Sequence, residues 1–324
     1  MNGGTDGTLP AAAPRLIARY ADPLTLATAA ADRILLATGD LLGQPGRRRV
    51  DCAVTGGGDG TRVLEAIARN PLRAAIDWSR VHVWWGDERF VPADDPDRNA
   101  LQARQALFDE LVADGSLPEA NIHEMPADPR SAEERARATD ADDLASLEEA
   151  ARRHEAELVR ELRPEPGEFP HLDIAWFGVG PEGHFASLFP YDPLLEAAAA
   201  NFSSASRLVA PVTRSPKPPA LRLTMTPALI RSARNVWITA SSDRKRTALT
   251  TAAGLHDDPR WPVSFAGGTD STIWMVDEAA MPSAAEPSGR QRRPGNPAPR
   301  PFLPSAAPHR AFCPMKSAIC SAEP

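Results

Sequence analysis

One histidine in the chain occupies a position suited to proton transfer. The segment LDIAWFGVGPEGHFASLFP carries an apolar stretch of strand length into a glycine-rich turn, and His184 closes that turn. An imidazole titrates near about pH 6.5 when unperturbed, so His184 can take a proton from water at neutral pH. We expect a helix to begin at Ala186, and Glu182 or another carboxylate to hold the imidazole in one tautomer. A lone histidine is usually structural, but this placement favours a catalytic role.

Three cationic side chains come from two other motifs. Arg89 follows Asp87 and Glu88 at the end of the apolar run in VHVWWGDERFVP, while Lys217 and Arg222 belong to TRSPKPPALRLTMT. A guanidinium presents a fork of donors to a phosphate or carboxylate, and the two acidic residues can orient that fork or a neighbouring base. A surface salt-bridge loop is the alternative. In an acidic protein these cations predict a local pocket for a phosphate group.

A glycine-rich turn forms the fourth motif. In VDCAVTGGGDGTRVLEAIA, Gly56, Gly57 and Gly58 follow an apolar run and precede a helical pattern. Such a turn offers unpaired backbone N–H groups to an anion or a carbonyl oxygen. Its spacing matches neither a dinucleotide-binding motif nor a P-loop, so a plain tight turn is the alternative.

Strand-like and helix-like stretches alternate along the chain, which predicts an α/β fold. Residues 172–179 and 236–240 are apolar on both alternating faces, as in parallel strands that helices cover on both sides. Loops that carry a site should then gather at the carboxyl ends of the strands. The predicted strands are 50–55, 81–85, 172–179, 207–212, 221–225, 236–240 and 272–276.

Helix candidates show apolar residues at every third or fourth position. The longest is heavily charged on one face, which predicts a solvated surface helix with a break near Thr139 or Asp140. Lys245 lies on another candidate and is a possible fourth cation of the site, although a solvated helix lysine is the alternative. The predicted helices are 23–42, 61–69, 99–112, 132–162 and 244–253.

Composition excludes several classes of protein. The chain has 324 residues, a net charge of -7 and a pI near 5.6, which argues against a nucleic-acid partner. It has neither an apolar run long enough for a membrane span nor a secretory signal pattern, so we expect a cytoplasmic protein without a membrane partner. Of three cysteines, Cys52 lies in an apolar run and is predicted to be a small core residue. Cys313 and Cys320 lie near the C-terminus, and the set fits neither a disulfide framework nor a zinc site.

Taken in order, these motifs resemble the 6-phosphogluconolactonase family, which is related to glucosamine-6-phosphate deaminase. The likeness covers roughly residues 23–280, and its most specific parts are GDERFVP at 86–92, GVGPEGHFASLFP at 178–190, SPKPPALRLTMT at 215–226 and TIWMVDEAA at 272–280. It implies a deaminase-like α/β fold with a mainly parallel central sheet and helices on both faces. We therefore expect a flexible N-terminus at 1–14, a phosphosugar lactonase domain at 15–280 and a disordered, proline-rich tail at 281–324.

The resemblance also implies residue roles. In the family the histidine of the GPDGH motif is taken as the catalytic base, which is His184 here, and Glu182 stands where the family usually has aspartate. The family's phosphosugar contacts correspond to Arg89, Lys217 and Arg222. The implied reaction is hydrolysis of 6-phospho-D-glucono-1,5-lactone to 6-phospho-D-gluconate in the oxidative pentose phosphate pathway, without a metal or organic cofactor. We expect a phosphosugar as the small-molecule partner, and a monomer or small homo-oligomer.

Water activated by His184 can open a δ-lactone directly, and the chain has no GxSxG motif that would indicate an acyl intermediate. Backbone N–H groups would stabilise the oxyanion, either from the turn at 56–58 or from the loop that contains Gly180 and Gly183. Two alternatives remain: a glucosamine-6-phosphate deaminase and a non-catalytic phosphosugar-binding regulator. The deaminase group has a different residue after its DE pair and an asparagine-glutamate-proline stretch after its histidine motif, where this chain has Arg89 and ASLFP at 186–190.

Overall fold

The computed structural model describes residues 11–164, 169–201 and 207–281. Most of the expected flexible N-terminus and nearly all of the expected tail lie outside these ranges. No helix within the described ranges is long and apolar enough to cross a membrane.

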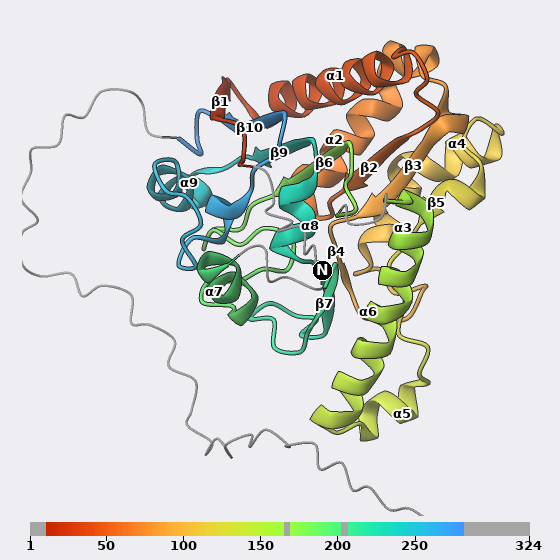
Figure 1. Cartoon of the computed structure of the whole chain (residues 1–324), viewed down its shortest axis with the longest axis vertical. Helices are drawn as coiled ribbons and strands as arrows, with labels where there is room; N and C mark the ends of the chain where they lie inside the picture. Colours follow the sequence, from red (N-terminus) through yellow and green to blue (C-terminus); the bar gives the residue numbers. More distant parts are fainter. Residues whose placement is uncertain (1–10, 165–168, 202–206, 282–324) are drawn as a thin grey trace, which may run out of the picture. The chain divides into compact units, whose positions relative to one another are not determined.

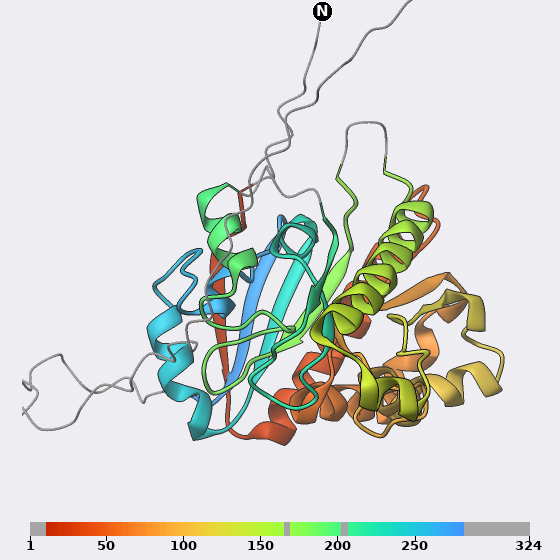
Figure 2. The ribbon, with the colours of Figure 1, turned by 90° about the horizontal axis from the view of Figure 1, so that it is seen from below.

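A seven-stranded sheet with every neighbouring pair parallel forms the centre of the fold, in the order β1-β10-β9-β6-β2-β3-β5. The apolar strands β6 and β9 are neighbours in its middle, and β9 and β10 run side by side in Figure 2. Placing the most apolar strands innermost is expected, because both of their faces are covered. The strands are β1 (Arg15–Tyr20), β2 (Val50–Val54), β3 (Val81–Trp85), β5 (Ile122–His123), β6 (Ile174–Gly178), β9 (Asn235–Ala240) and β10 (Ser271–Asp277).

Helices cover both faces of this sheet, as predicted. On one face, α1 (Pro23–Leu42), α2 (Gly57–Arg69), α3 (Asn99–Ala103) and α4 (Asp109–Ala113) share a hydrophobic core with one set of alternating strand residues. On the other face, α6 (Asp140–Leu162), α7 (Pro193–Ala200), α8 (Pro227–Ser232) and α9 (Arg246–Ala252) pack on the other set. Figure 1 shows α1 and α2 on one side of the row of strands and α6 and α7 on the other. The fold is therefore a three-layer α/β sandwich.

A second sheet of three antiparallel strands was not expected. It has the order β4-β8-β7, with β4 (Asp87–Arg89), β8 (Arg222–Met225) and β7 (Val209–Val212). β4 follows β3 after Gly86 alone, so the chain leaves the main sheet and enters the small one within one residue. The small sheet thus brings the GDER motif against the strand that begins at Arg222.

Most predicted elements lie close to their observed bounds. Helix α1 and strand β3 match to the residue, and the long charged stretch divides into α5 (Ala132–Arg137) and α6 at the predicted break. Thr139 caps α6 by accepting a hydrogen bond from the Asp142 N–H, while the Asp142 carboxylate accepts one from the Thr139 N–H. The helix predicted at 99–112 is interrupted by a π-helical turn at 104–108.

The helix predicted to begin at Ala186 is wrong. Residues 186–192 form turns, and α7 begins only at Pro193. Ala186 has a φ of 48° and Tyr191 a φ of 63°, both in the left-handed region, and a right-handed helix cannot pass through such residues. His184 therefore lies in an irregular loop and not at a helix entrance.

Candidate active site

The glycine-rich turn connects β2 to α2 at the carboxyl edge of the main sheet. Gly56 is the residue before the helix, and Gly57 has a φ of 76°, a conformation that glycine adopts without strain. A Cβ on Gly60 would lie 2.4 Å from the backbone oxygen of Thr55, so only glycine lets the helix start this close to the strand. The first N–H groups of α2 lack partners within the helix and point toward the space beyond the strand ends.

The sequence suggested that Glu88 orients the Arg89 guanidinium or a neighbouring base, but its carboxylate binds backbone N–H groups instead. Its fully buried carboxylate accepts hydrogen bonds from the backbone N–H groups of Arg89, Asn99 and Ala100, at 2.7, 2.7 and 2.8 Å. Burial raises the pKa of Glu88 to about 7, although Arg98 and these N–H groups favour the ionised form. Glu88 therefore anchors the start of α3 beneath the site.

Asp87 was expected to orient Arg89 but contacts Ser187 and Arg222 instead. Its Oδ2 accepts a hydrogen bond of 2.6 Å from the Ser187 hydroxyl and lies 3.9 Å from Nη1 of Arg222. The Arg89 guanidinium instead donates to the carbonyl oxygen of Asp97. Asp87 thus helps position Arg222 and the loop that carries His184.

The His184 imidazole packs closely against Gly180 of its own loop. A Cβ on Gly180 would be 2.0 Å from Nδ1 of His184, so the loop needs glycine there. The other ring face stacks on Phe189, with centroids 4.8 Å apart. These contacts give the ring one orientation.

Glu182 reaches His184 despite being one methylene longer than the family's usual aspartate. Its Oε1 lies 3.1 Å from Nδ1 of His184 and 2.9 Å from Nζ of Lys217. Burial would raise the pKa of Glu182, but hydrogen bonds from His184 and Lys217 outweigh it and hold the pKa at about 2. The carboxylate is therefore ionised and only accepts hydrogen bonds, which favours the tautomer with a proton on Nδ1 and a basic Nε2, while Nζ of Lys217 lies 3.3 Å from the same Nδ1.

Arg222 is buried and held by the loop that precedes it. Its Nε donates to the carbonyl of Pro219 at 3.0 Å and its Nη2 to that of Lys217 at 3.1 Å, after a cis peptide bond between Pro218 and Pro219. In the small sheet Arg222 lies directly opposite Arg89. Like charges facing each other across strands are unfavourable unless an anion lies between them. Burial lowers the pKa of Arg222, with Asp87 opposing this and Arg89 adding to it.

A network around Asp59 was missed from the sequence. The buried Asp59 carboxylate forms ion pairs with Lys245 and Arg62 and accepts from the Ser241 N–H at 3.0 Å. Burial would raise the pKa of Asp59, but Lys245 and Ser241 lower it below its usual value. Lys245 is largely buried and not a solvated helix lysine, and the network joins the glycine turn to the end of β9. An acidic residue in the first turn of α2 was the available signal.

These elements enclose a cavity of about 290 Å³. Asn99 also lines it, although the sequence motifs did not single this residue out. Its amide donates to the carbonyl of Asp87 at 3.0 Å. Glu182 and Gly183 are absent from the lining, although Glu182 contacts two lining residues, His184 and Lys217. Ten of the predicted site residues line the cavity: Gly56, Gly57, Gly58, Asp87, Arg89, Gly180, His184, Lys217, Arg222 and Lys245.

Backbone N–H groups for the oxyanion were predicted from either the glycine turn at 56–58 or the histidine loop, and those of the histidine loop are already bonded within it. The Gly180 N–H donates to the carbonyl of His184 and the Gly183 N–H to that of Gly180, both at 2.9 Å. Gly183 has a φ of 86° and shapes the turn. The geometry therefore favours the start of α2, at Gly57 and Gly58, over the histidine loop.

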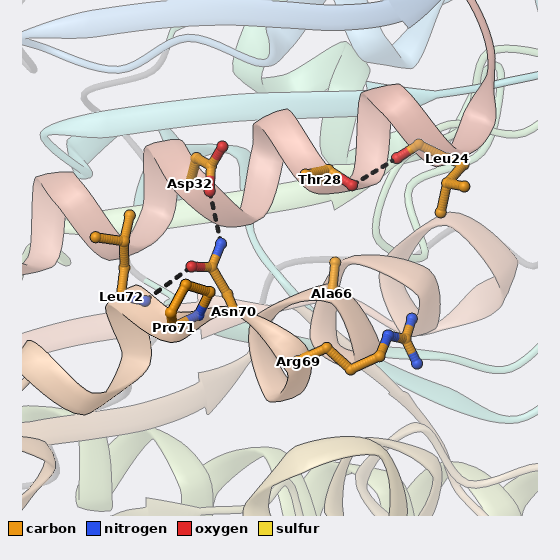
Figure 3. Close-up of a pocket in the computed structure, with 8 residues that line it drawn as sticks. All are labelled: Leu24, Thr28, Asp32, Ala66, Arg69, Asn70, Pro71 and Leu72. Atoms are coloured by element: carbon orange, nitrogen blue, oxygen red, sulfur yellow. Dashed lines mark hydrogen bonds between the residues drawn. The ribbon is translucent and has the colours of Figure 1, made fainter.

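A larger cavity of about 430 Å³ lies between α1 and the end of α2. Figure 3 shows its lining, where Asn70 donates to Asp32 at 2.6 Å while Leu24 and Leu72 contribute apolar surface. Helix α2 begins at the smaller cavity and ends at this one, so its 13 residues separate the two by roughly 20 Å. The lining lacks a histidine and a cluster of cations, so the smaller cavity is the candidate active site.

Comparison with known proteins identifies relatives over most of the chain. Residues 21–274 match the family described as glucosamine-6-phosphate isomerases/6-phosphogluconolactonase. A protein of Streptomyces coelicolor named 6-phosphogluconolactonase is 37% identical over 268 residues, covering 82% of this chain and 93% of the relative. One of Mycobacterium tuberculosis with the same name is 35% identical, covering 81% of this chain and 95% of the relative.

Solved structures share the fold at lower identity. The 6-phosphogluconolactonase of Trypanosoma brucei superposes with a TM-score of 0.65 at 23% identity, covering 83% of this chain and 98% of that one. A monomeric glucosamine-6-phosphate deaminase superposes with a TM-score of 0.56 at 18% identity, covering 82% and 98%. Because the match extends over most of the sequence and of the fold, this chain belongs to the glucosamine-6-phosphate isomerase/6-phosphogluconolactonase family.

Proposed function

We propose that the chain hydrolyses 6-phospho-D-glucono-1,5-lactone to 6-phospho-D-gluconate, a step of the oxidative pentose phosphate pathway. One observation carries the proposal: a histidine oriented by a carboxylate and two facing arginines line the same cavity. The names of relatives at 35% to 37% identity support the choice of substrate. The reaction needs water and no metal or organic cofactor.

His184 acts as the base in this proposal. Its Nε2 takes a proton from a water molecule, and the oxygen of that water attacks C1 of the lactone. Glu182, which accepts a hydrogen bond from Nδ1, stabilises the imidazolium that forms. The N–H groups of Gly57 and Gly58 at the start of α2 stabilise the oxyanion. When the C1 bond to the ring oxygen breaks, the imidazolium returns the proton to that oxygen.

Phosphate binding is assigned to the three cations that line the cavity, Arg89, Arg222 and Lys217. An anion bound by both Arg89 and Arg222 relieves the repulsion between the like charges of two residues that are paired across the strands. Lys217 has a side chain that is 40% exposed, so it can exchange its contact with Glu182 for one with the phosphate. Binding the remote phosphate holds C1 in line with the attacking water.

The cellular setting follows from the same proposal. A soluble metabolic substrate and an acidic chain with a net charge of -7 suit a cytoplasmic enzyme, acting as a monomer or small homo-oligomer without a nucleic-acid or membrane partner.

The deciding experiment is a pH-stat assay of lactone hydrolysis above the spontaneous rate, run beside a measurement of ammonia release from glucosamine 6-phosphate. We expect lactone turnover without ammonia. Ammonia release would favour the deaminase, whose fold is shared. Binding of 6-phosphogluconate without turnover of either substrate would favour a phosphosugar-binding regulator.

A further inference from the structure

A second cluster of titratable side chains lies outside the active site, on the sheet face that α6 covers. His82 on β3 and His123 on the edge strand β5 meet there, with His154, Glu157 and Glu161 of α6 packed over them. The proposed lactone chemistry uses none of these residues.

The two strand histidines direct nitrogen atoms at each other. Nδ1 of His82 lies 2.9 Å from Nε2 of His123, and the rings stack with centroids 5.2 Å apart. Nδ1 of His123 lies 2.8 Å from Oε1 of Glu157. The Glu157 carboxylate accepts this hydrogen bond, so Nδ1 of His123 carries the proton. Nε2 of neutral His123 therefore presents a lone pair toward His82.

A carboxylate completes a set of three ligand atoms. One atom from each of His82, His123 and Glu161 lies within 4.8 Å of the other two. We propose that these three side chains bind a divalent cation that favours nitrogen and oxygen ligands, such as zinc, with water in the fourth position. Zinc–nitrogen bonds of about 2.0 Å in a tetrahedral site place two ligand nitrogens roughly 3.3 Å apart. The histidine pair has to open by only a few tenths of an ångström.

The surroundings of His123 suit a metal ligand. Glu157 behind its Nδ1 matches the carboxylate that commonly fixes the tautomer of a zinc-bound histidine. Trp84 stacks on the ring at 4.0 Å between centroids, and the indole N–H donates to Asp51 at 2.9 Å. The ring is therefore held in place before a cation arrives.

His82 and Glu161 are the two partly exposed ligands, and they leave the proposed site open to a cation from solvent. His82 is half-buried and its Nδ1 lies 2.9 Å from Nε2 of His123, so two of the three ligand nitrogen and oxygen atoms are already adjacent. The Glu161 side chain is 23% exposed, which leaves a path from solvent. Its contact with Nη1 of Arg49 is 3.4 Å long, whereas Arg49 holds Asp51 at 2.7 Å, so a cation can draw Glu161 away while Arg49 stays paired.

Charge also favours a cation here. Two guanidiniums, Arg49 and Arg160, face three carboxylates, Asp51, Glu157 and Glu161, and these five groups sum to one negative charge. A bound cation would tie the two-residue edge strand β5 to β3 and α6. Because the unfolded chain does not hold the three ligands together, binding should stabilise the folded protein.

Zinc titration of the full chain, stripped of metal with a chelator, tests the proposal. Binding is followed by competition with a chromophoric chelator and by the midpoint of thermal unfolding. We expect the wild type to bind one zinc more than His82→Gln and to gain thermal stability from it. His256→Gln, which changes an exposed histidine, should behave as the wild type. Glu157→Gln should weaken the site by about 10- to 100-fold while leaving its stoichiometry unchanged.

Two further measurements distinguish this site from a thiolate site and from an effect of poor folding. Cobalt(II) in the site should give visible bands without a thiolate charge-transfer band, which separates it from any site that uses Cys313 or Cys320. Glu161→Gln keeps the histidine pair and alters a partly exposed helix residue. It therefore tests the site if His82→Gln folds poorly. We expect this variant to bind zinc at least about tenfold more weakly than the wild type. Equal zinc stoichiometry and affinity in the wild type, His82→Gln and Glu161→Gln would overturn the proposal and leave a plain histidine–histidine hydrogen bond. Lactone turnover is measured separately, so its failure is distinguishable from failure of this site.

Discussion

His184 and Glu182 act as one unit in the proposed chemistry, because the carboxylate determines which imidazole nitrogen is basic. The 3.1 Å contact exists although glutamate replaces the usual aspartate, since the loop at 180–184 and the neighbouring Lys217 let the longer side chain fold back onto Nδ1. Residue identity alone could not show whether that carboxylate would reach.

Removing the base should stop catalysis without removing binding. We expect His184→Ala to lower kcat by about 100- to 10,000-fold, because general base catalysis contributes that much. Affinity for 6-phosphogluconate, measured by calorimetry, should change little. His171→Ala, at an exposed position, serves as the control. Near-normal turnover in His184→Ala would remove this residue from the base role.

The charge on Glu182 should appear in the pH dependence of the rate. Its pKa near 2 keeps it ionised throughout the working range, where it favours the protonated imidazole. In Glu182→Gln that charge is lost, so we expect the acid limb of the kcat/KM profile to move to lower pH, with reduced kcat. Glu182→Asp keeps the charge and should hold the limb close to its original position. A limb that does not move in Glu182→Gln would show that the carboxylate is not coupled to the base.

Arg89 should act on binding more than on chemistry. We expect Arg89→Ala to raise KM for the lactone by about 10- to 100-fold with a smaller change in kcat, because one charge-assisted phosphate contact, worth ~1.5–3 kcal/mol, is lost. Inhibition by inorganic phosphate, compared between the two proteins, checks the assignment. Unchanged phosphate inhibition would place the phosphate elsewhere.

At the scale of elements, four parts of the site follow the carboxyl ends of main-sheet strands: the glycine turn after β2, the GDER segment after β3, the histidine loop after β6 and Lys245 after β9. Lys217 and Arg222 come instead from the loop before β8 and the first residue of that strand in the small sheet. The apolar strands and amphipathic helices were predictable because burial on one or both faces is visible in the residue pattern. The loop after Gly178 was not, because contacts of its residues with distant parts of the chain hold it. The Ser187 hydroxyl donates to Asp87 and Gly183 lies close to Trp261, on either side of the left-handed Ala186. β4 was missed since its three residues are all charged.

The closeness of β2 and α2 gives a test of the turn. Gly60→Ala would place a methyl group 2.4 Å from the Thr55 oxygen, which must move the turn. We expect the free energy of unfolding, measured in urea, to fall by roughly 1–3 kcal/mol and kcat to fall with it. Gly58→Ala is the matched control for stability, because its Cβ would meet Arg62 at an ordinary 3.6 Å. Equal stability of the two variants would contradict the tight approach.

For the whole molecule, the proposed enzyme domain ends near residue 280. The family match extends to residue 274, and Ala280 and Met281 are buried against the core. The proline-rich composition after residue 280 predicts a boundary there, and it stays a prediction. The packing of β10 beside β1 was not predictable because β1 itself went unrecognised.

A chain ending at residue 284 should therefore retain lactone turnover and thermal stability. The expected result is the same kcat/KM and the same midpoint of thermal unfolding as in the full chain. A large loss of either would assign the final forty residues a role in the enzyme itself.

The pairing of β1 with β10 has a consequence for synthesis on the ribosome. Residues 15–20 emerge early, yet the one strand that pairs with them in the described part of the chain, 271–277, is made after 250 further residues. Until then β1 has no neighbour, and the edge of β9 is open to other chains. The nascent polypeptide thus spends most of its translation with an unsealed sheet, and assembly of the catalytic cavity must await nearly complete synthesis of the domain.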